Sequence, residues 1–279
     1  MTDCRLIIDP PSAGPWNMAV DEWLWDWAGR TGQWCLRFYR WDQPTLSLGY
    51  FQNHDDRRQH PSSASCPAVR RISGGGAIVH DVEWTYSLAV PLTRPVGRPP
   101  GPSLDEGHVP TRTARGGWNM PHQWLYEVVH GAIVEVLADF GVPAKVHRRE
   151  QEAPMSPLPF LCFERRSPGD VLVGSIKVAG SAQRRSARAL LQHGSLLLAR
   201  SLAAPELPGL KELTGREFRF ESVLEAWLAR LSDRLRLAWT GSPLAQSERE
   251  SISQFVAEKH ARLDWVRSRT RSAFSASSQ

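Results

Sequence analysis

Apolar side chains recur at helical spacing in three segments of the chain, which predicts three helices. The first runs through Met18–Ala28, and Asn17 stands where it can cap the helix. The second covers Gln123–Phe140 and is followed by Gly141, a residue typical of helix C-termini. The third covers Glu221–Trp239. The pattern therefore predicts a chain with substantial helical content.

Shorter apolar runs, alternating or continuous, predict strands between these helices. The runs are Leu6–Asp9, Cys35–Tyr39, Thr45–Leu48, Ala68–Ile72, Ala77–His80, Thr85–Pro91, Val171–Val173, Ile176–Ala179 and Ala189–Leu198. The Gly174–Ser175 pair suits a tight hairpin. Two Pro-rich segments without periodicity, Arg94–Pro121 and Gln151–Pro159, are predicted loops. Because helices and hairpin-linked strands mix without regular alternation, we expect an α+β fold with a mixed, largely antiparallel sheet flanked by helices.

The pattern indicates one large domain with a small C-terminal appendage. We assign residues 1–240 to the domain and residues 241–279 to the appendage. Within the appendage, Ser247 precedes Glu250 by three positions, which is the spacing of a capping box at a helix start. The last residues, Ser268–Gln279, are polar, and we expect a disordered tail.

Composition excludes several classes of protein. Of the 279 residues, 41% are hydrophobic and 23% are charged, which is ordinary for a globular protein. No apolar run approaches the roughly 18 residues of a membrane span, and the N-terminus does not resemble a secretory signal. The four cysteines form no C-x-x-C pair that would indicate a metal or redox site. We therefore expect a reduced, cytoplasmic protein without a metal and without membrane attachment.

The net charge of +5 suits an acidic partner. The basic residues show neither an RNA-binding motif with interleaved aromatic residues nor zinc-finger spacing, so nucleic acid is not the expected partner.

The segment RRISGGGAIVHD, residues 70–81, is the first candidate for a binding site. Consecutive glycines allow a sharp turn and a close approach to a ligand, and free amides there can receive a carbonyl or an anion. The spacing is neither that of a dinucleotide fingerprint nor that of a P-loop. The candidate binding residues are Arg71, Ser73, Gly74, Gly75, Gly76, Ala77, Ile78, Val79 and His80. A plain hairpin turn between two strands explains the glycines equally well.

Three further side chains are candidates for chemistry. Lys177 lies between two apolar strand residues and faces the opposite side, where it meets either a pocket or solvent. Cys162 precedes it by 15 positions, and the hairpin of residues 170–179 can bring the two together. A free cysteine is more often a small buried hydrophobe than a nucleophile, and a nucleophile needs a nearby cation. His193 is either a ligand contact or a hydrogen-bonded structural histidine.

Taken together, these segments resemble the lipoate–protein ligase and octanoyltransferase superfamily, which is related in fold to biotin–protein ligases. The matching stretches are RRISGGGAIVHD, KVAGSAQRR and LQHGSLLL, with NMAVDE and PTLSLGYFQ before them, all in the family's order. The biotin-ligase variant of the glycine segment is absent. The resemblance implies a biotin/lipoate ligase-like catalytic domain and covers most of the chain from Asn17 to Leu198.

Within the superfamily, the chain is most similar to the cysteine-dependent octanoyl-carrier-protein:protein octanoyltransferases. The similarity lies in Cys-Phe-Glu at 162–164, upstream of KVAGSAQ, and in EWTYS at 83–87. It implies that Cys162 forms an acyl thioester and that Lys177 favours the thiolate. It also implies an acyl carrier protein as octanoyl donor and a lipoyl-carrier protein as acceptor, either the glycine cleavage H protein or a 2-oxoacid dehydrogenase E2 domain. No cofactor is then required.

Gly76 departs from this branch, whose members often have arginine at the third glycine position, so the triple glycine is more ligase-like. Two alternatives therefore stay open. One is an ATP- and Mg²⁺-dependent lipoate–protein ligase. The other is amidotransfer of octanoyl between lipoyl-carrier proteins. A binding protein that has lost turnover is a third, but such a protein has no reason to keep both Cys162 and Lys177.

Overall fold

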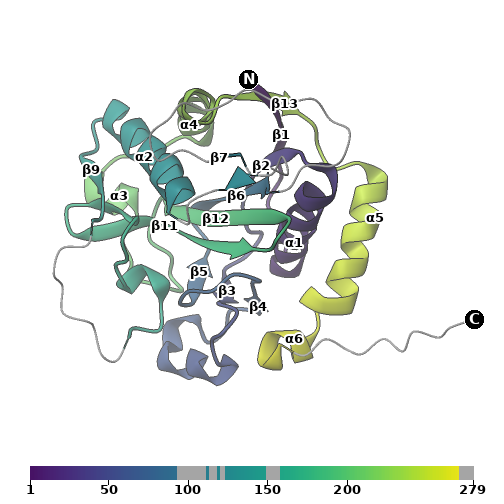
Figure 1. The fold of residues 1–279 in the computed structure, drawn as a ribbon. Coiled ribbons are helices and arrows are strands. Elements are labelled where there is room, and N and C mark those ends of the chain that lie inside the picture. The colour runs from purple at the N-terminus through teal and green to yellow at the C-terminus, as the bar shows by residue number, and fades with distance from the viewer. Residues whose placement is uncertain (93–110, 113–117, 120–122, 149–157, 270–279) are drawn as a thin grey trace, which may run out of the picture.

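The computed structural model describes residues 1–92, 111–112, 118–119, 123–148 and 158–269 (Figure 1). Its strands are β1 (Thr2–Ile8), β2 (Trp34–Tyr39), β3 (Thr45–Leu48), β4 (Ala68–Arg70), β5 (Ile78–His80), β6 (Glu83–Pro91), β7 (Thr111–Arg112), β8 (Trp118–Asn119), β9 (Ala144–Val146), β10 (Val171–Val173), β11 (Ile176–Arg185), β12 (Ala189–Leu197) and β13 (Leu237–Gly241). Its α-helices are α1 (Gly14–Thr31), α2 (Trp124–Asp139), α3 (Leu210–Thr214), α4 (Phe220–Leu235), α5 (Gln246–Phe255) and α6 (Leu263–Ser268). Short helical turns are η1 (His54–Gln59), η2 (Pro61–Ser63), η3 (Cys162–Glu164) and the π-helical turn η4 (Val256–His260).

An eight-stranded sheet forms the centre of the molecule, in the order β13-β1-β2-β6-β12-β11-β10-β9. The pairs β1–β13 and β1–β2 are parallel, and every other pair in this sheet is antiparallel. This confirms the predicted α+β class with a mixed, largely antiparallel sheet. The hairpin at Gly174–Ser175 also forms, with Val173 opposite Ile176 and Gly174 at a φ of 60°.

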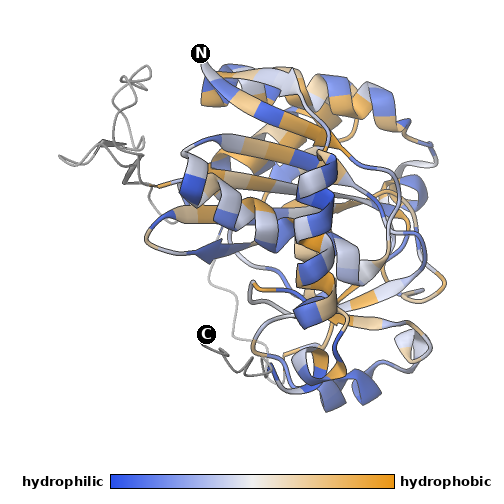
Figure 2. Cartoon of the chain, turned by 90° about the vertical axis from the view of Figure 1, so that its right-hand side faces the viewer, coloured by the Kyte–Doolittle hydropathy of each residue, from blue (hydrophilic) through white to orange (hydrophobic). Residues whose placement is uncertain are grey.

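Helices cover both faces of the sheet, so the molecule has three layers (Figure 1). On one face, α2 and α4 pack together over a core that includes Leu88, Val129 and Trp227. On the other face, α1 packs with α5 over a core that includes Leu24 and Leu191. Hydrophobic and hydrophilic residues are mixed along the strands of the sheet and along the helices in Figure 2. No helix in the described part of the chain is long and apolar enough to cross a membrane.

A second sheet of three strands, in the order β4-β3-β5, carries the glycine segment. β3 lies in the middle, parallel to β4 and antiparallel to β5. The glycine segment that joins β4 to β5 therefore crosses over β3, because its two flanking strands are not neighbours. The alternative of a plain hairpin turn is wrong for residues 73–77.

Three predicted helix boundaries are wrong. Asn17 does not cap α1, which begins three residues earlier; Asn17 is buried and its side-chain amide donates to the carbonyls of Ser12 and Arg40. The helix predicted over 221–239 ends at Leu235, because Arg236 adopts a left-handed φ of 52° and β13 follows. At α5, Glu248 rather than Glu250 reaches back, and it accepts from the amide of Ala245.

The predicted loops fall mostly outside the described residues, as does most of the expected polar tail. Within the first loop, β7 and β8 form a short antiparallel ladder that the sequence pattern did not predict. The division proposed at residue 240 falls inside β13, which pairs with β1. Beyond it, α5 and η4 pack on α1, and Ile252 and Trp265 are buried. The described part of the C-terminal segment thus packs on the same core as α1.

Candidate active site

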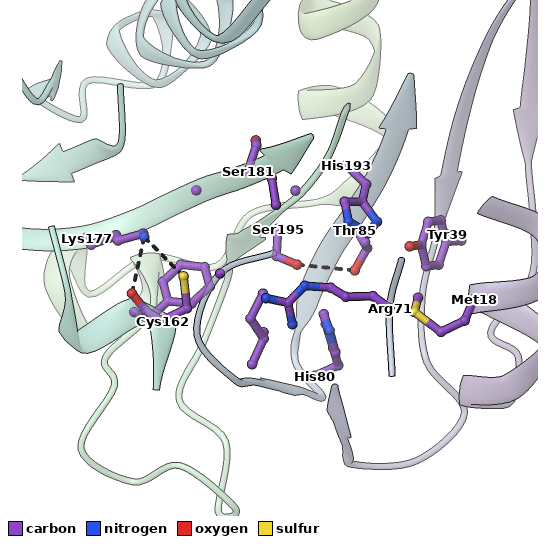
Figure 3. A pocket seen from close by; sticks show the side chains of 16 residues that line it. Met18, Tyr39, Arg71, His80, Thr85, Cys162, Lys177, Ser181, His193 and Ser195 are labelled. Atoms are coloured by element: carbon purple, nitrogen blue, oxygen red, sulfur yellow. Dashed lines mark hydrogen bonds between the residues drawn. The ribbon is translucent and has the colours of Figure 1, made fainter. Parts of the chain in front are cut away.

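One pocket brings the glycine segment, β11, β12 and η3 together (Figure 3). Its lining residues are Met18, Tyr39, Arg71, Gly75, Ile78, His80, Thr85, Cys162, Phe163, Lys177, Gly180, Ser181, Ala182, His193, Gly194 and Ser195. Cys162 and Lys177 lie at one end and Met18 and Tyr39 at the other. The wall that faces the pocket is mainly apolar, which suits a hydrocarbon chain.

Lys177 reaches Cys162 at the first end. Its Nζ lies 3.7 Å from Cys162 Sγ and donates to the Cys162 carbonyl oxygen at 3.2 Å. The ammonium also pairs with Asp170, Nζ to Oδ2 at 2.9 Å, and both side chains are almost fully buried. The strand hairpin explains this arrangement, because Asp170 precedes β10 and Lys177 lies on β11 beside it. A cation thus lies next to the sulfur, and a carboxylate holds the cation there.

A close fit of backbones positions Cys162. The Cys162 amide donates to the Ala77 carbonyl (2.7 Å), and the Ala77 amide donates to Phe160 (3.1 Å). Gly76 lies directly against this segment: a Cβ there would come within 3.1 Å of the Cα and N atoms of Cys162 and of the guanidinium carbon of Arg165. Glycine at position 76 therefore has a packing reason, which is the close approach of the nucleophile's own backbone.

Arg71 holds the glycine segment in shape. Its guanidinium donates to the carbonyls of Gly74 (2.8 Å), Gly76 (2.6 Å) and Ser47 (2.9 Å). It has no carboxylate partner among the described residues, and burial lowers the pKa of Arg71 to about 10. Gly75 takes a φ of 95°, a conformation that favours glycine.

With those carbonyls turned to Arg71, the amides of Gly75 and Gly76 have no acceptor in the described chain. Gly75 is exposed and lines the pocket. Free backbone amides beside a nucleophile are the usual donors to a developing oxyanion. The Ala77 amide, which belongs to the same predicted group, is already occupied by Phe160.

The other end of the pocket is a closed hydrogen-bond network around Asp21. This buried carboxylate accepts from Tyr39 OH (2.9 Å) and Arg37 Nη1 (3.1 Å), and it lies 2.9 Å from His193 Nδ1. The other ring nitrogen of His193 faces the Ser73 hydroxyl. Burial alone would raise the pKa of Asp21, but the contacts with His193 and the charge of Arg37 outweigh it and lower that pKa.

His80 is held in a similar way below the pocket. It stacks on Trp41, with ring centroids 3.9 Å apart, and its two nitrogens meet Glu83 and the Ser47 hydroxyl (2.8 Å). Burial lowers the pKa of His80, so its neutral form is favoured. Both histidines therefore present a fixed ring face to the pocket.

The predicted site residues divide into two groups. Those that line the pocket are Cys162, Lys177, Arg71, Gly75, Ile78, His80 and His193; those that support it from behind are Ser73, Gly74, Gly76, Ala77 and Val79. Val79 is buried in a separate small core. Val178 and Leu196, apolar residues on β11 and β12, lie in the main core and do not line the pocket.

Sequence reasoning missed several residues that the structure places at the site. Met18 and Tyr39 were predicted only as the bounds of a helix and a strand, and Asp21, inside that helix, received no role at the site. Asp170 was noted only as one end of a hairpin. A charged residue directly before an apolar strand, opposite a strand lysine, is the signal that could have identified Asp170.

The lipoyl protein ligase A/B catalytic domain matches residues 14–98 and 114–231, which is most of the chain and includes every residue that lines the pocket. The chain belongs to this family. Its relatives include the octanoyltransferase LipM of Exiguobacterium sibiricum, 31% identical over 89% of this chain and 92% of that protein. The octanoyltransferase LipM of Carboxydothermus hydrogenoformans is 28% identical over 95% of this chain and 99% of that protein.

Solved structures of the family share the fold. A bipartite lipoate protein ligase from an archaeal lipoylation system of Thermoplasma acidophilum aligns with a TM-score of 0.70, at 16% identity, over 97% of this chain and 98% of that one. Lipoate-protein ligase A bound with ATP aligns with a TM-score of 0.70, at 18% identity, over 95% and 98% of the two chains. At such identities the likeness establishes the fold, which is that of the lipoate–protein ligases.

Proposed function

We propose that this protein is an octanoyltransferase of protein lipoylation, which moves octanoyl from acyl carrier protein through a Cys162 thioester to the lysine of a lipoyl-carrier protein. The observation that carries the proposal is the distance of 3.7 Å between Lys177 Nζ and Cys162 Sγ at one end of an apolar pocket. The two relatives are both named octanoyltransferases, and this chain aligns with nearly the whole length of each. Their names therefore support the same reaction.

In the first step the Cys162 thiolate attacks the carbonyl carbon of the donor thioester. The new bond joins Sγ to the acyl carbon, and the bond to the carrier's sulfur breaks. Lys177, held by Asp170, supplies the proton that the leaving thiolate takes. We assign the developing oxyanion to the free amide of Gly75, which lines the pocket and can donate a hydrogen bond to it. One such donor lowers the activation free energy by about 3 kcal/mol.

In the second step the amine of the acceptor lysine attacks the same carbonyl carbon. An amide forms, and Cys162 leaves as the thiolate. The proton lost by the attacking amine returns to Lys177, which restores the starting state. The donor is already an activated thioester, so the cycle needs neither ATP nor a metal ion.

The ligase alternative depended on the triple glycine, and the packing of Gly76 weakens it. Any side chain at position 76 would meet the backbone of Cys162 and the guanidinium of Arg165, so the third glycine has a local cause in this chain. Cys162 itself serves no purpose in an adenylating ligase. Amidotransfer between lipoyl-carrier proteins uses the same nucleophile, and only its donor differs.

Intact-mass spectrometry separates the three reactions. The protein is incubated with octanoyl-carrier protein, with octanoate plus ATP and Mg²⁺, or with an octanoylated lipoyl-carrier protein. The proposal expects one octanoyl group, removable by hydroxylamine, from the first donor only. Cys162→Ala should abolish the adduct and Cys66→Ala, a buried cysteine outside the pocket, should keep it. Labelling that persists in Cys162→Ala, or turnover only with ATP, contradicts the proposal.

A further inference from the structure

Three side chains that lie against the glycine segment or within four residues of Cys162 in the sequence have surfaces that no other part of the described chain covers. The Phe51 side chain is 75% exposed, although it lies against the glycine segment, 3.8 Å from where a Cβ on Gly74 would be. Leu158 is 59% exposed, four residues before Cys162. Arg165 follows Cys162 by three residues and lies against Gly76. We call Phe51, Leu158 and Arg165 the docking rim.

Arg165 has no carboxylate partner among the described residues. Its Nε donates to the Pro159 carbonyl at 2.6 Å, and no other hydrogen bond from its guanidinium occurs within that part of the chain. The remaining N–H groups are therefore free to bind a group from outside. A planar guanidinium fits a carboxylate through two parallel hydrogen bonds.

The loop that carries Phe51 is rigidly attached to the site. The Tyr50 amide donates to the Ser73 carbonyl (2.8 Å), and Arg70 binds the carbonyls of Gly49 (2.9 Å) and Gln52 (2.8 Å). A Cβ on Gly49 would come within 2.1 Å of the Gly75 carbonyl, so the two loops are in direct backbone contact. Phe51 is thus exposed on a fixed support, as a residue that anchors a protein interface should be.

We propose that the docking rim receives the acceptor protein, an acidic carrier domain with a carboxylate near its target lysine. This rests on the proposed function, because it assumes that the thioester on Cys162 is attacked by a protein lysine. A lysine stem has only four carbons. The backbone of the acceptor must therefore come close to Cys162 and touch what surrounds it, whereas a donor with a long flexible arm need not.

Charge favours the same partner. Lys177, Arg71 and Arg165 all lie near Cys162, against the carboxylates of Asp170 and of Glu164, which belongs to the same helical turn as Cys162. The excess of positive charge attracts an acidic surface and speeds its association. Phe51 and Leu158 supply the apolar contact, and Arg165 pairs with the carboxylate beside the target lysine.

The test separates binding from chemistry and uses the full chain. Binding of the unmodified glycine cleavage H protein is measured by isothermal titration, and Cys162 loading is measured by intact mass with a small octanoyl thioester. The variants are Phe51→Ser, Leu158→Ser, Arg165→Gln and Arg165→Lys. The matched controls are Leu202→Ser, at a side chain that is 95% exposed in the turn at 201–204, and Arg58→Gln, at an exposed arginine on η1.

Phe51→Ser and Arg165→Gln should each weaken binding about tenfold. Arg165→Lys should weaken it less, because lysine keeps the charge but lacks the planar guanidinium that makes two parallel hydrogen bonds. The ratio of transfer to loading should fall in parallel. Arg165→Glu should regain affinity for an H protein whose acidic residues nearest the target lysine are replaced by lysine. Affinity equal to that of the controls overturns the docking rim even if loading is normal. Absent loading in the unmodified chain overturns the proposed function instead, and the titration still tests the rim.

Discussion

The two ends of the pocket are built on opposite principles. At the far end, Asp21 is saturated: a guanidinium, a hydroxyl and an imidazole surround it, and each donor is itself fixed by a strand or helix. At the near end, Lys177 has one carboxylate partner and the free amides of the glycine segment have none in the described chain. The far end maintains the shape of the pocket. The near end retains unpaired hydrogen-bond donors, which a reacting acyl group would use.

This difference predicts which residues should affect the stability of the fold and which should affect the rate of acyl transfer. A buried network in which every group is paired is costly to break, because the partners that remain lose their hydrogen bonds. A group whose partners are supplied by the substrate contributes little to the folded state and much to the transition state. The variants below test that division, from the largest expected effect to the smallest.

Asp21→Asn should produce the largest loss of stability. It leaves Arg37 with Asp9 as its ionic partner, and the single amide oxygen cannot replace both carboxylate oxygens, one of which accepts from Arg37 and the other from Tyr39. Breaking a buried ion pair costs about 3–5 kcal/mol. The folded state lowers the pKa of Asp21 below its ordinary 3.8, so its contribution is complete above pH 3.8 and is lost as pH falls through the folded value. Urea unfolding of the parent and the variant at pH 7 and pH 3 measures the loss of stability and its dependence on pH. An unchanged midpoint at pH 7 would contradict a stabilising role of Asp21.

Lys177→Ala should produce the largest loss of rate. Transfer should slow by about 100-fold, the usual scale for a positioned acid or base. Alkylation of Cys162 by iodoacetamide at neutral pH should slow as well, and raising the pH should recover part of it. Lys177→Arg should retain partial activity, because it keeps the charge with a different reach. If the variant and the parent show identical pH profiles of alkylation, Lys177 does not act on the sulfur.

Asp170→Asn should separate the charge of Lys177 from its position. Without the carboxylate, the ammonium loses its 2.9 Å partner, and its charge is no longer offset. Transfer should fall about tenfold, while alkylation of Cys162 at neutral pH should stay the same or rise. A parallel fall of both rates would show that Asp170 only supports the local fold.

Met18→Ala should have the smallest effect, at the far end of the pocket. A shorter side chain there lengthens the apolar slot without touching Cys162. Decanoyl transfer should gain severalfold relative to octanoyl transfer, because a methylene in an apolar pocket changes binding by about 1–3 kcal/mol. Competition between the two acyl donors gives the ratio, and an unchanged ratio would place the acyl tail elsewhere.

The sequence pattern was sufficient for most strands of the sheet and for the hairpin, and it allowed Cys162 and Lys177 to meet, but it did not predict the edge strands β9 and β13. Periodicity finds strands, and a two-residue turn fixes which strands are neighbours, so Lys177 could be located near residue 170. It could not show that β4 and β5 flank β3, because that pairing depends on contacts between distant segments. For the same reason Asp21 was missed: its partners Arg37, Tyr39 and His193 come from three other segments.

The end of α4 was missed because a contact between distant strands decides it. Leu237–Trp239 continues the apolar pattern of α4, and only the left-handed backbone at Arg236 stops the helix. Arginine is not a typical stop residue, so the pairing of β13 with β1, made by the first strand of the chain, decides the boundary.

The bonds of Arg70 have a consequence for the order in which the site assembles during synthesis. This buried guanidinium holds the loop at Gly49 and Gln52, and it also donates to the carbonyl of Val266 (2.6 Å) at the end of α6. The Val266 carbonyl is translated almost two hundred residues after Arg70. Until residues 265–267 have been synthesised, Arg70 has only the acceptors at 49–52. A nascent chain can thus form the first strands of the sheet early, but the loop at 49–52 becomes fixed only when α6 docks.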